Sequence, residues 1–213
     1  MKIYRSLKRG IITAALFFCG ASLSACGGSD NYEAEEDTVF VSSNGDIRAY
    51  IQSDFSEEYY DQQELLNFID SSVEDYIRKA GEDTVKLEEF YVQDDIASAR
   101  MSYASVTDYA DFNGVEFFTG TVISAQARGY RFDGNYIAVE KGEPTGEKAD
   151  GSEFMDSEDL KCVIIGQPTA VKVSGDIVYV SEGNVTLLDS RLARVSYDKL
   201  SADAEAGYII YKK

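Results

Sequence analysis

Short runs in which hydrophobic and polar residues alternate follow one another along the chain from about residue 38. A period of two is typical of strands that bury one face. The first two runs, 39–41 and 47–51, flank Asn44-Gly45, a dipeptide that favours the tight turn of a β-hairpin. The pattern therefore predicts a hairpin at the start of the folded body.

Further runs of the same kind predict strands over most of the remaining chain. Two of them, joined through Asp94-Asp95, predict a second hairpin. Short strands at close spacing, separated by turn residues, favour an antiparallel sheet. The predicted strands are 85–92, 96–103, 136–140, 161–165, 169–173, 177–181, 185–188, 192–196 and 208–211.

The segment 61–80 differs from these runs because its apolar residues recur every three or four positions, which predicts a long amphipathic helix. Asp61, with Glu64 three residues later, resembles a capping box at the start of this helix. Gly81 is a typical helix end. The apolar stripe consists of Leu65, Leu66, Ile69, Val73, Tyr76, Ile77 and Ala80.

Two shorter helices are also expected. One covers 106–112, opened by Ser105 or Thr107 and closed at Asn113-Gly114. The segment 116–128 is ambiguous, because its aromatic and β-branched residues favour a strand and its alanines favour a helix. We expect a short helix there from about Thr121.

Together these elements predict an α+β fold. It would consist of a mostly antiparallel sheet built from hairpins, the helix at 61–80 and one or two short helices. A single domain would cover 38–213, because a chain of this size can bury one good core. Residues 142–159, rich in acids and containing Pro144, are expected to form a polar loop.

The first 25 residues have a different pattern. The basic residues Lys2, Arg5, Lys8 and Arg9 precede an uncharged, mostly apolar stretch, 11–25. A membrane-spanning helix needs about 20 apolar residues, so this stretch is short for a permanent span. A basic start, a short apolar run and small residues at its end indicate an export signal.

Leu23-Ser24-Ala25-Cys26, at the end of that stretch, resembles the lipobox of bacterial lipoproteins. The resemblance implies that a diacylglyceryl group is attached to the Cys26 sulfur and that residues 1–25 are then removed. Two acyl chains hold a protein stably on a membrane, whereas a single chain binds reversibly. The expected location is the extracytoplasmic face of the cell membrane, with residues 26–37 as an acidic, flexible tether.

The folded body is similar to small membrane lipoproteins of Gram-positive bacteria, through the stretches 111–121 (DFNGVEFFTGT) and 207–211 (GYIIY). This resemblance implies no particular activity. In a cell with one membrane, the anchor would place the body outside the plasma membrane. In a cell with two membranes, Gly27 after Cys26 would favour export to the outer membrane.

Charge narrows the set of partners. Removal of residues 1–25 takes away four basic residues and no acidic one, so the mature chain carries 16 basic and 38 acidic residues, a net charge of −22. This excess of acid argues against binding to nucleic acid or to an anionic membrane surface. The membrane is therefore expected to be a partner through the lipid alone.

Candidate chemistry is sparse. The chain has no histidine, which excludes Ser-His-Asp and Cys-His nucleophiles and metal sites built on imidazole. Ser196-Tyr197-Asp198-Lys199 matches an S-x-x-K pattern, but it follows a predicted strand, whereas that chemistry requires the start of a helix. We therefore expect no catalytic residue, no metal site and no cofactor beyond the lipid on Cys26.

Three candidates of another kind remain. Cys162 lies in an apolar run and is expected to be a buried core residue. The acids Asp150, Glu153, Asp156, Glu158 and Asp159 leave open a calcium site in an irregular loop. Tyrosine provides stiff contact area with a polar end, so a binding face could include Tyr59, Tyr60, Tyr91, Tyr103, Tyr109, Tyr130, Tyr136 and Tyr179, although strand packing is the simpler role for these residues.

The function expected from the sequence is that of a non-enzymatic binding or accessory domain at the cell surface, with a protein or glycan partner. Two alternatives stay open: a carboxylate-based glycan hydrolase, or the solute-binding component of a transporter.

Overall fold

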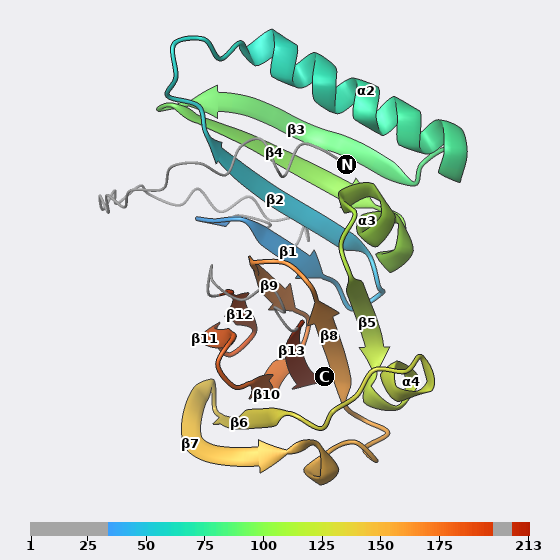
Figure 1. Ribbon diagram of the computed structural model, residues 1–213, viewed down its shortest axis with the longest axis vertical. Coiled ribbons are helices and arrows are strands. Elements are labelled where there is room, and N and C mark those ends of the chain that lie inside the picture. Colours follow the sequence, from blue (N-terminus) through green and yellow to red (C-terminus); the bar gives the residue numbers. More distant parts are fainter. Residues whose placement is uncertain (1–33, 198–205) are drawn as a thin grey trace, which may run out of the picture.

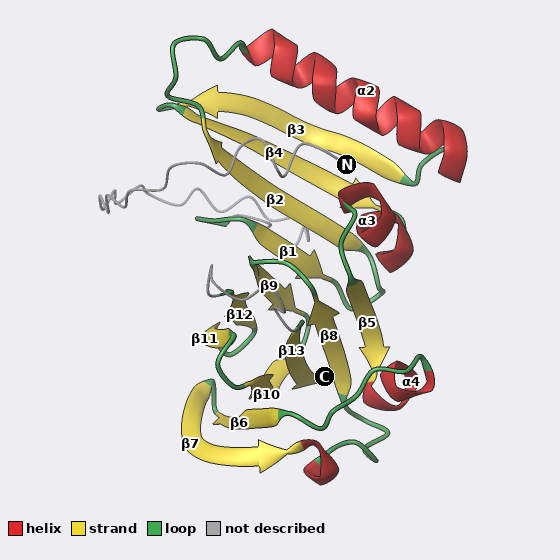
Figure 2. Ribbon diagram, in the orientation of Figure 1, coloured by secondary structure: helices red, strands yellow, loops and turns green. Residues whose placement is uncertain are grey.

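Two β-sheets form the framework of the described part of the chain (Figures 1 and 2). The computed structural model describes residues 34–197 and 206–213. One sheet has seven strands in the order β11-β12-β9-β1-β2-β4-β3, and the other has six in the order β5-β8-β13-β10-β6-β7. Pairing between neighbours is antiparallel except for β1 with β9. With its helices, the chain has the α+β fold expected from its sequence.

The strands have the following bounds. The seven-stranded sheet contains β1 Thr38–Val41, β2 Ile47–Asp54, β3 Val85–Gln93, β4 Ile96–Tyr103, β9 Thr169–Val173, β11 Val185–Asp189 and β12 Leu192–Val195. The six-stranded sheet contains β5 Phe117–Thr121, β6 Asn135–Glu140, β7 Glu143–Asp150, β8 Lys161–Ile165, β10 Asp176–Ser181 and β13 Gly207–Lys212.

The helices begin and end at the residues that the sequence marks. Helix α2, Gln62–Ala80, is capped by Asp61, whose carboxylate accepts a hydrogen bond from the Glu64 amide at 2.8 Å, and ends at Gly81. Helix α3, Val106–Asn113, is capped by Ser105 and ends at Gly114 in the left-handed conformation. The ambiguous stretch contains both expected elements, because β5 leads into helix α4, Val122–Ala127, which is capped by Thr121.

The larger hydrophobic core lies between the two sheets. It joins Val39 and Ile47 of the seven-stranded sheet to Ile165 and Ile209 of the six-stranded sheet, all of them nearly inaccessible to solvent. Helix α2 lies alongside β3 at one end of the molecule (Figure 1) and packs on the same core face. Its residues in this contact are Leu65, Ile69, Val73 and Tyr76.

A second core covers the opposite face of the six-stranded sheet. Cys162 and Ile164 of β8 point into it and are fully buried. Phe132 and Phe154 pack over them from outside the sheet, and α4 contributes Val122. The six-stranded sheet therefore buries both of its faces at β8 and β13, while its edge strand β7 stays exposed.

The expectation of a polar loop over 142–159 is wrong for its first half. Residues 143–150 form the edge strand β7, which pairs with β6 through a two-residue turn at Lys141 and Gly142, both with positive φ. Almost every side chain of β7 is exposed, so the strand shows no alternation of apolar and polar residues. Lysine at the first turn position also replaces the asparagine or aspartate that usually marks such a turn.

The first hairpin is confirmed, but its turn is longer than a two-residue turn. Val41 pairs with Ile47, and the Ser42 amide bonds to the Asp46 carbonyl at 3.1 Å. Gly45 has a φ of 97°, which requires glycine or a small polar residue. The Asn-Gly pair thus marks the hairpin without fixing the turn length.

Candidate functional site

The residues of the expected lipidation site, Leu23, Ser24, Ala25 and Cys26, lie outside the described part of the chain. Most of the expected tether, 26–37, lies outside it as well; its last residues, from Ala34, are described. Cys162 is fully buried in the second core, and burial raises the pKa of its thiol to about 12. A thiol with so high a pKa is not a nucleophile at neutral pH, so Cys162 is a packing residue.

The seven-stranded sheet has one face that neither the six-stranded sheet nor α2 covers. Side chains alternate along each strand, so those that do not point into the shared core point to this side. We call it the outer face. It consists of Thr38, Phe40, Arg48, Tyr50, Gln52, Lys86, Glu88, Glu89, Tyr91, Ser98, Arg100, Ser102, Ala170, Lys172, Thr186, Leu192 and Arg194.

Hydrogen-bonded hydroxyl groups occupy the middle of the outer face. The Tyr50 hydroxyl lies 3.3 Å from Ser98 Oγ and 3.3 Å from the Tyr91 hydroxyl, and it accepts a bond from Gln52 Nε2 at 2.8 Å. The Arg100 guanidinium lies over the Tyr50 ring, 5.8 Å from its centroid. Burial is the main cause of the raised pKa of Tyr50. This network holds two aromatic rings, those of Tyr50 and Tyr91, and several polar groups in fixed positions on the sheet.

Ion pairs hold basic side chains near the β3 edge of the outer face. Arg100 donates to Glu89 at 2.7 Å, and Lys86 donates to Glu88 at 3.0 Å. Glu88 also accepts from Ser102 Oγ at 2.7 Å, and these two bonds lower the pKa of its carboxyl.

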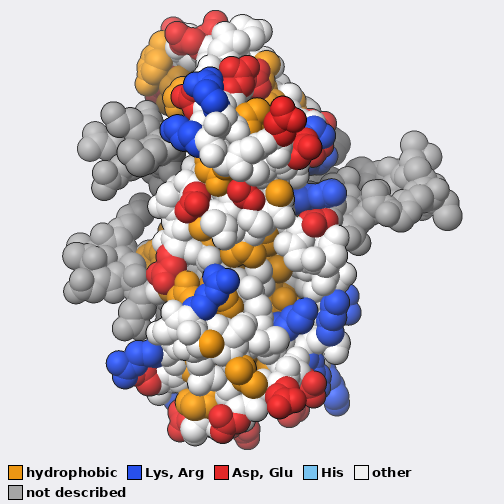
Figure 3. All heavy atoms as spheres, turned by 90° about the vertical axis from the view of Figure 1, so that its right-hand side faces the viewer, with side chains coloured by type: hydrophobic (Ala, Val, Ile, Leu, Met, Phe, Trp, Pro, Cys, Tyr) orange, Lys and Arg blue, Asp and Glu red, His pale blue; other side chains and the backbone are white. Residues whose placement is uncertain are grey.

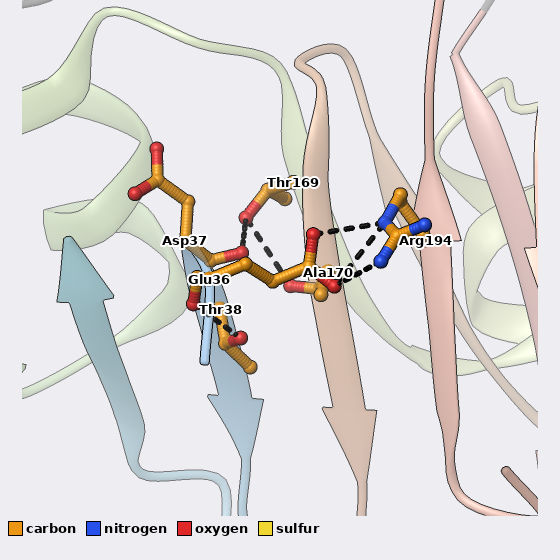
Figure 4. A network of polar contacts seen from close by, with 6 residues as sticks. All are labelled: Glu36, Asp37, Thr38, Thr169, Ala170 and Arg194. Carbon is orange, nitrogen blue, oxygen red and sulfur yellow. Dashed lines mark hydrogen bonds and ion pairs between the residues drawn. The ribbon is translucent and has the colours of Figure 1, made fainter. Parts of the chain in front are cut away.

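The chain enters the folded body on the same face (Figure 4). Glu36 binds Arg194 through two parallel bonds, Nε to Oε2 at 2.8 Å and Nη2 to Oε1 at 2.6 Å. The Asp37 carbonyl accepts from the Thr169 hydroxyl at 3.0 Å and from the Ala170 amide at 2.9 Å. The residues before β1 are thus fixed to β9 and β12, in the middle of the sheet.

The tyrosines named from the sequence lie in several separate parts of the structure. Tyr103, Tyr109 and Tyr136 are buried in the cores, so packing explains them. Tyr59 is 74% exposed and contacts Tyr60 edge-on, with 4.9 Å between ring centroids. Of the rest, Tyr91 belongs to the outer face, whereas Tyr130 and Tyr179 pack on the second core. No single tyrosine surface unites the set.

The acidic residues considered for calcium do not gather around an ion position. Asp150 and Glu153 form a capping box on a short 3-10 helix, Gly151–Glu153, in which Asp150 accepts from the Ser152 amide at 2.7 Å. In the described ranges, no group of three or more acidic or cysteine side chains has the arrangement of a metal site.

The carboxyl groups with perturbed pKa values bear on the hydrolase alternative. Three described carboxyls, those of Asp54, Glu88 and Asp150, have a shifted pKa, and hydrogen bonds lower all three. A general acid in glycoside hydrolysis needs a raised pKa. These groups are therefore unsuited to that role.

Sequence reasoning missed the outer face because the face depends on strand order. Arg48, Lys86 and Lys172 occupy polar positions of predicted strands, but β9 lies beside β1 after a separation of more than 120 residues. The sequence does show the alternation of apolar and polar residues within each strand. This alternation separates outward from inward positions, but it does not show which strands are neighbours in the sheet.

Comparisons with known proteins assign the chain to no family and find no protein of similar fold. No protein-family model matches the chain, and no curated protein or solved structure matches it at a significant level. Among the helices that the structure describes, none is both long and apolar enough to cross a membrane.

Proposed function

We propose that this chain is a lipid-anchored, extracytoplasmic lipoprotein whose folded body binds a partner at the cell surface without catalysing a reaction. The observation that carries the proposal is the uneven use of the two sheets. The six-stranded sheet buries both faces at β8 and β13, whereas the seven-stranded sheet keeps one face of ordered polar, aromatic and charged side chains.

The anchor part of the proposal is supported by the basic and apolar start of the chain and by Leu23-Ser24-Ala25-Cys26. Cys26 would carry the diacylglyceryl group. The position of the first described residues fits a tethered body, because Glu36 and Asp37 are held by side chains and backbone of the seven-stranded sheet. A load on the tether would be received in the middle of a sheet.

The types of side chain present, and the way in which they are held, support the proposal that the body binds a partner without catalysis. The chain has no histidine, and the described carboxyls with shifted pKa values are shifted away from the range of a general acid. Hydrogen bonds and ion pairs fix the outer-face side chains, which reduces the entropy lost when they contact a partner.

Mass spectrometry of the protein extracted from membranes tests the anchor. The expected product begins at Cys26 and carries the added mass of a diacylglyceryl group, whereas Cys26→Ser keeps residues 1–25 and gains no lipid. A chain cleaved elsewhere, or an unmodified Cys26, would contradict the anchor.

Recovery of partners from membranes tests the binding part. The unaltered chain and a variant with Arg48→Ala, Tyr91→Ala and Arg100→Ala are compared, with exchanges at Arg131, Lys141 and Lys148 as the matched control. These control residues are exposed and lie around β6 and β7. We expect recovery to fall for the first variant only; equal recovery from both would exclude the outer face.

A further inference from the structure

Strand register places three basic side chains in one row across the outer face. Lys172 of β9 lies opposite Phe40 of β1, and Phe40 lies opposite Arg48 of β2. Arg48 in turn lies opposite Ser102 of β4, and Ser102 opposite Lys86 of β3. Across five neighbouring strands, the three basic residues therefore alternate with two uncharged ones. The order is Lys172, Phe40, Arg48, Ser102 and Lys86. We call these five residues the basic row.

The spacing of the charges follows from sheet geometry. Adjacent strands lie about 4.8 Å apart, so side chains separated by one intervening strand start about 10 Å from each other. Lys172, Arg48 and Lys86 are exposed, whereas Phe40 is buried and forms the floor between the first two. The row thus presents three charges to solvent at regular intervals, in a line perpendicular to the strands.

One described ion pair involves a residue of the basic row. Glu88 pairs with Lys86, and its charge also interacts with Arg48. Lys172 forms no ion pair with any described carboxylate. Lys213 donates to the Ser43 carbonyl at 3.3 Å, so another basic side chain reaches the turn that follows β1.

This arrangement contrasts with the charge of the chain as a whole, which is −18. Acidic side chains are frequent around the α2 end of the molecule, at the top of Figure 3. Exposed charges are screened beyond about 8–10 Å at physiological salt, and packed sheets are themselves about 10 Å apart. A ligand lying on the basic row therefore responds mainly to the charges of the outer face itself, which are the row and the paired acids Glu36, Glu88 and Glu89.

The spacing distinguishes between kinds of anionic partner. An extended acidic peptide repeats its side chains on one face about every 6.8 Å, which does not match the row. A linear polysaccharide with one acidic group per disaccharide repeats its charge over a length close to the interval in the row. Such a polymer is flexible enough to follow the twist of a sheet and has hydroxyl groups for partners such as Ser102.

We propose that the basic row is a binding site for a linear anionic polysaccharide that crosses the strands of the seven-stranded sheet. The proposal rests on the proposed function as a cell-surface binding protein and names the substrate class of the outer face. Carboxylate and phosphate groups share the required chemistry, and Lys172, Arg48 and Lys86 would each meet one acidic group.

The test uses the mature chain with Cys26→Ser and a fluorescent oligosaccharide of hyaluronate, which has one carboxylate per disaccharide. Fluorescence anisotropy at low salt is expected to show saturable binding that weakens as salt is raised. Because three charge contacts are removed, Lys172→Gln, Arg48→Gln and Lys86→Gln together should weaken binding by about tenfold or more. The single change Lys172→Gln, which breaks no described ion pair, should weaken it by a smaller factor.

The matched control exchanges Arg131, Lys141 and Lys148 for glutamine, which removes the same charge from the region of β6 and β7 and should leave binding within about twofold. A phosphorylated polysaccharide is expected to bind as well and to be weakened by the same three exchanges, which would support the site. The proposal would be overturned if hyaluronate failed to bind at low salt, or if the control variant lost as much affinity as the triple variant. Tighter binding of poly-L-glutamate or of neutral dextran than of hyaluronate would also overturn it. Because the chain in this assay carries no lipid, the result is independent of the fate of Cys26.

Discussion

The two sheets use similar strands in different ways. In β8 of the six-stranded sheet, Val163 and Ile165 point into the shared core, while Cys162 and Ile164 point into the second core. In β2 of the seven-stranded sheet, Ile47 and Ala49 point into the shared core, while Arg48 and Tyr50 lie on the outer face.

The difference indicates which of the two sheets has side chains that can contact a partner. A strand buried on both sides is nearly continuous in apolar residues, as KCVII in β8 is, and any change there affects packing. A strand with one outward face can exchange its exposed outward residues, such as Arg48 and Lys172, at little cost in stability. The six-stranded sheet therefore acts mainly as the scaffold, and the outer face can be adapted to a ligand.

The largest expected effect comes from truncation on the doubly covered sheet. Ile164→Ala should lower the free energy of unfolding by about 2–5 kcal/mol, because it leaves a cavity in the second core. Thr186→Ala, at an exposed outward position of β11, should change it by about 0.5 kcal/mol or less. Urea denaturation measures both. Similar losses for the two variants would mean that the outer face is a structural face as well.

A smaller effect is expected from the hydroxyl network. Tyr50→Phe removes a hydroxyl that meets Ser98, Tyr91 and Gln52, so it should cost about 1 kcal/mol. Tyr179→Phe on the six-stranded sheet keeps the ring contact with Phe154 and should be nearly neutral. Thermal unfolding compares the two, and equal melting temperatures would show that the network adds no stability.

The ion pair at the chain entry should contribute less. Glu36→Gln removes a doubly bonded partner of Arg194, but both side chains are partly exposed, so the loss should be about 0.2–1 kcal/mol and should shrink at high salt. Asp75→Asn breaks the more exposed pair with Arg78 on α2 and serves as the control. A loss for Glu36→Gln that does not depend on salt would argue against a Coulombic origin.

The smallest expected effect depends on pH. Because the pKa of Glu88 is lowered in the folded state, its carboxylate stabilises the fold above the ordinary value of about 4.3, and this contribution is lost as pH falls through the lowered pKa. Glu88→Gln should therefore be less stable than the parent at pH 7, and the difference should shrink as the pH falls below about 4.3. A difference that grows on acidification would reverse the sign of the linkage.

Local signals in the sequence predicted the helices well. Asp61, Ser105 and Thr121 each cap a helix, and Gly81 and Gly114 end two of them. Capping depends on residues within one turn, so it can be found without knowing the fold.

Non-local features were beyond the same reasoning. The parallel pairing of β1 with β9 joins distant segments, and β7 is held by backbone pairing while its side chains remain in solvent. The same limit applies to the outer face. Its outward residues can be identified strand by strand from the sequence, but the basic row can be recognised only when the strand order is known. The expected lipidation site is a local motif and remains a prediction.

The central claim is that the outer face, and no other surface, meets a partner on the cell. Hydroxyl-radical footprinting tests it by comparing the lipid-anchored protein on native membranes with the purified Cys26→Ser chain. Tyr91 and Ile96 on β3 and β4 report on the seven-stranded sheet, and the exposed Ile123 on α4 and Phe68 on α2 report on other surfaces. We predict that oxidation of Tyr91 and Ile96 falls on native membranes while that of Ile123 and Phe68 is unchanged. Protection of Ile123 or Phe68 with Tyr91 and Ile96 unprotected would contradict the account.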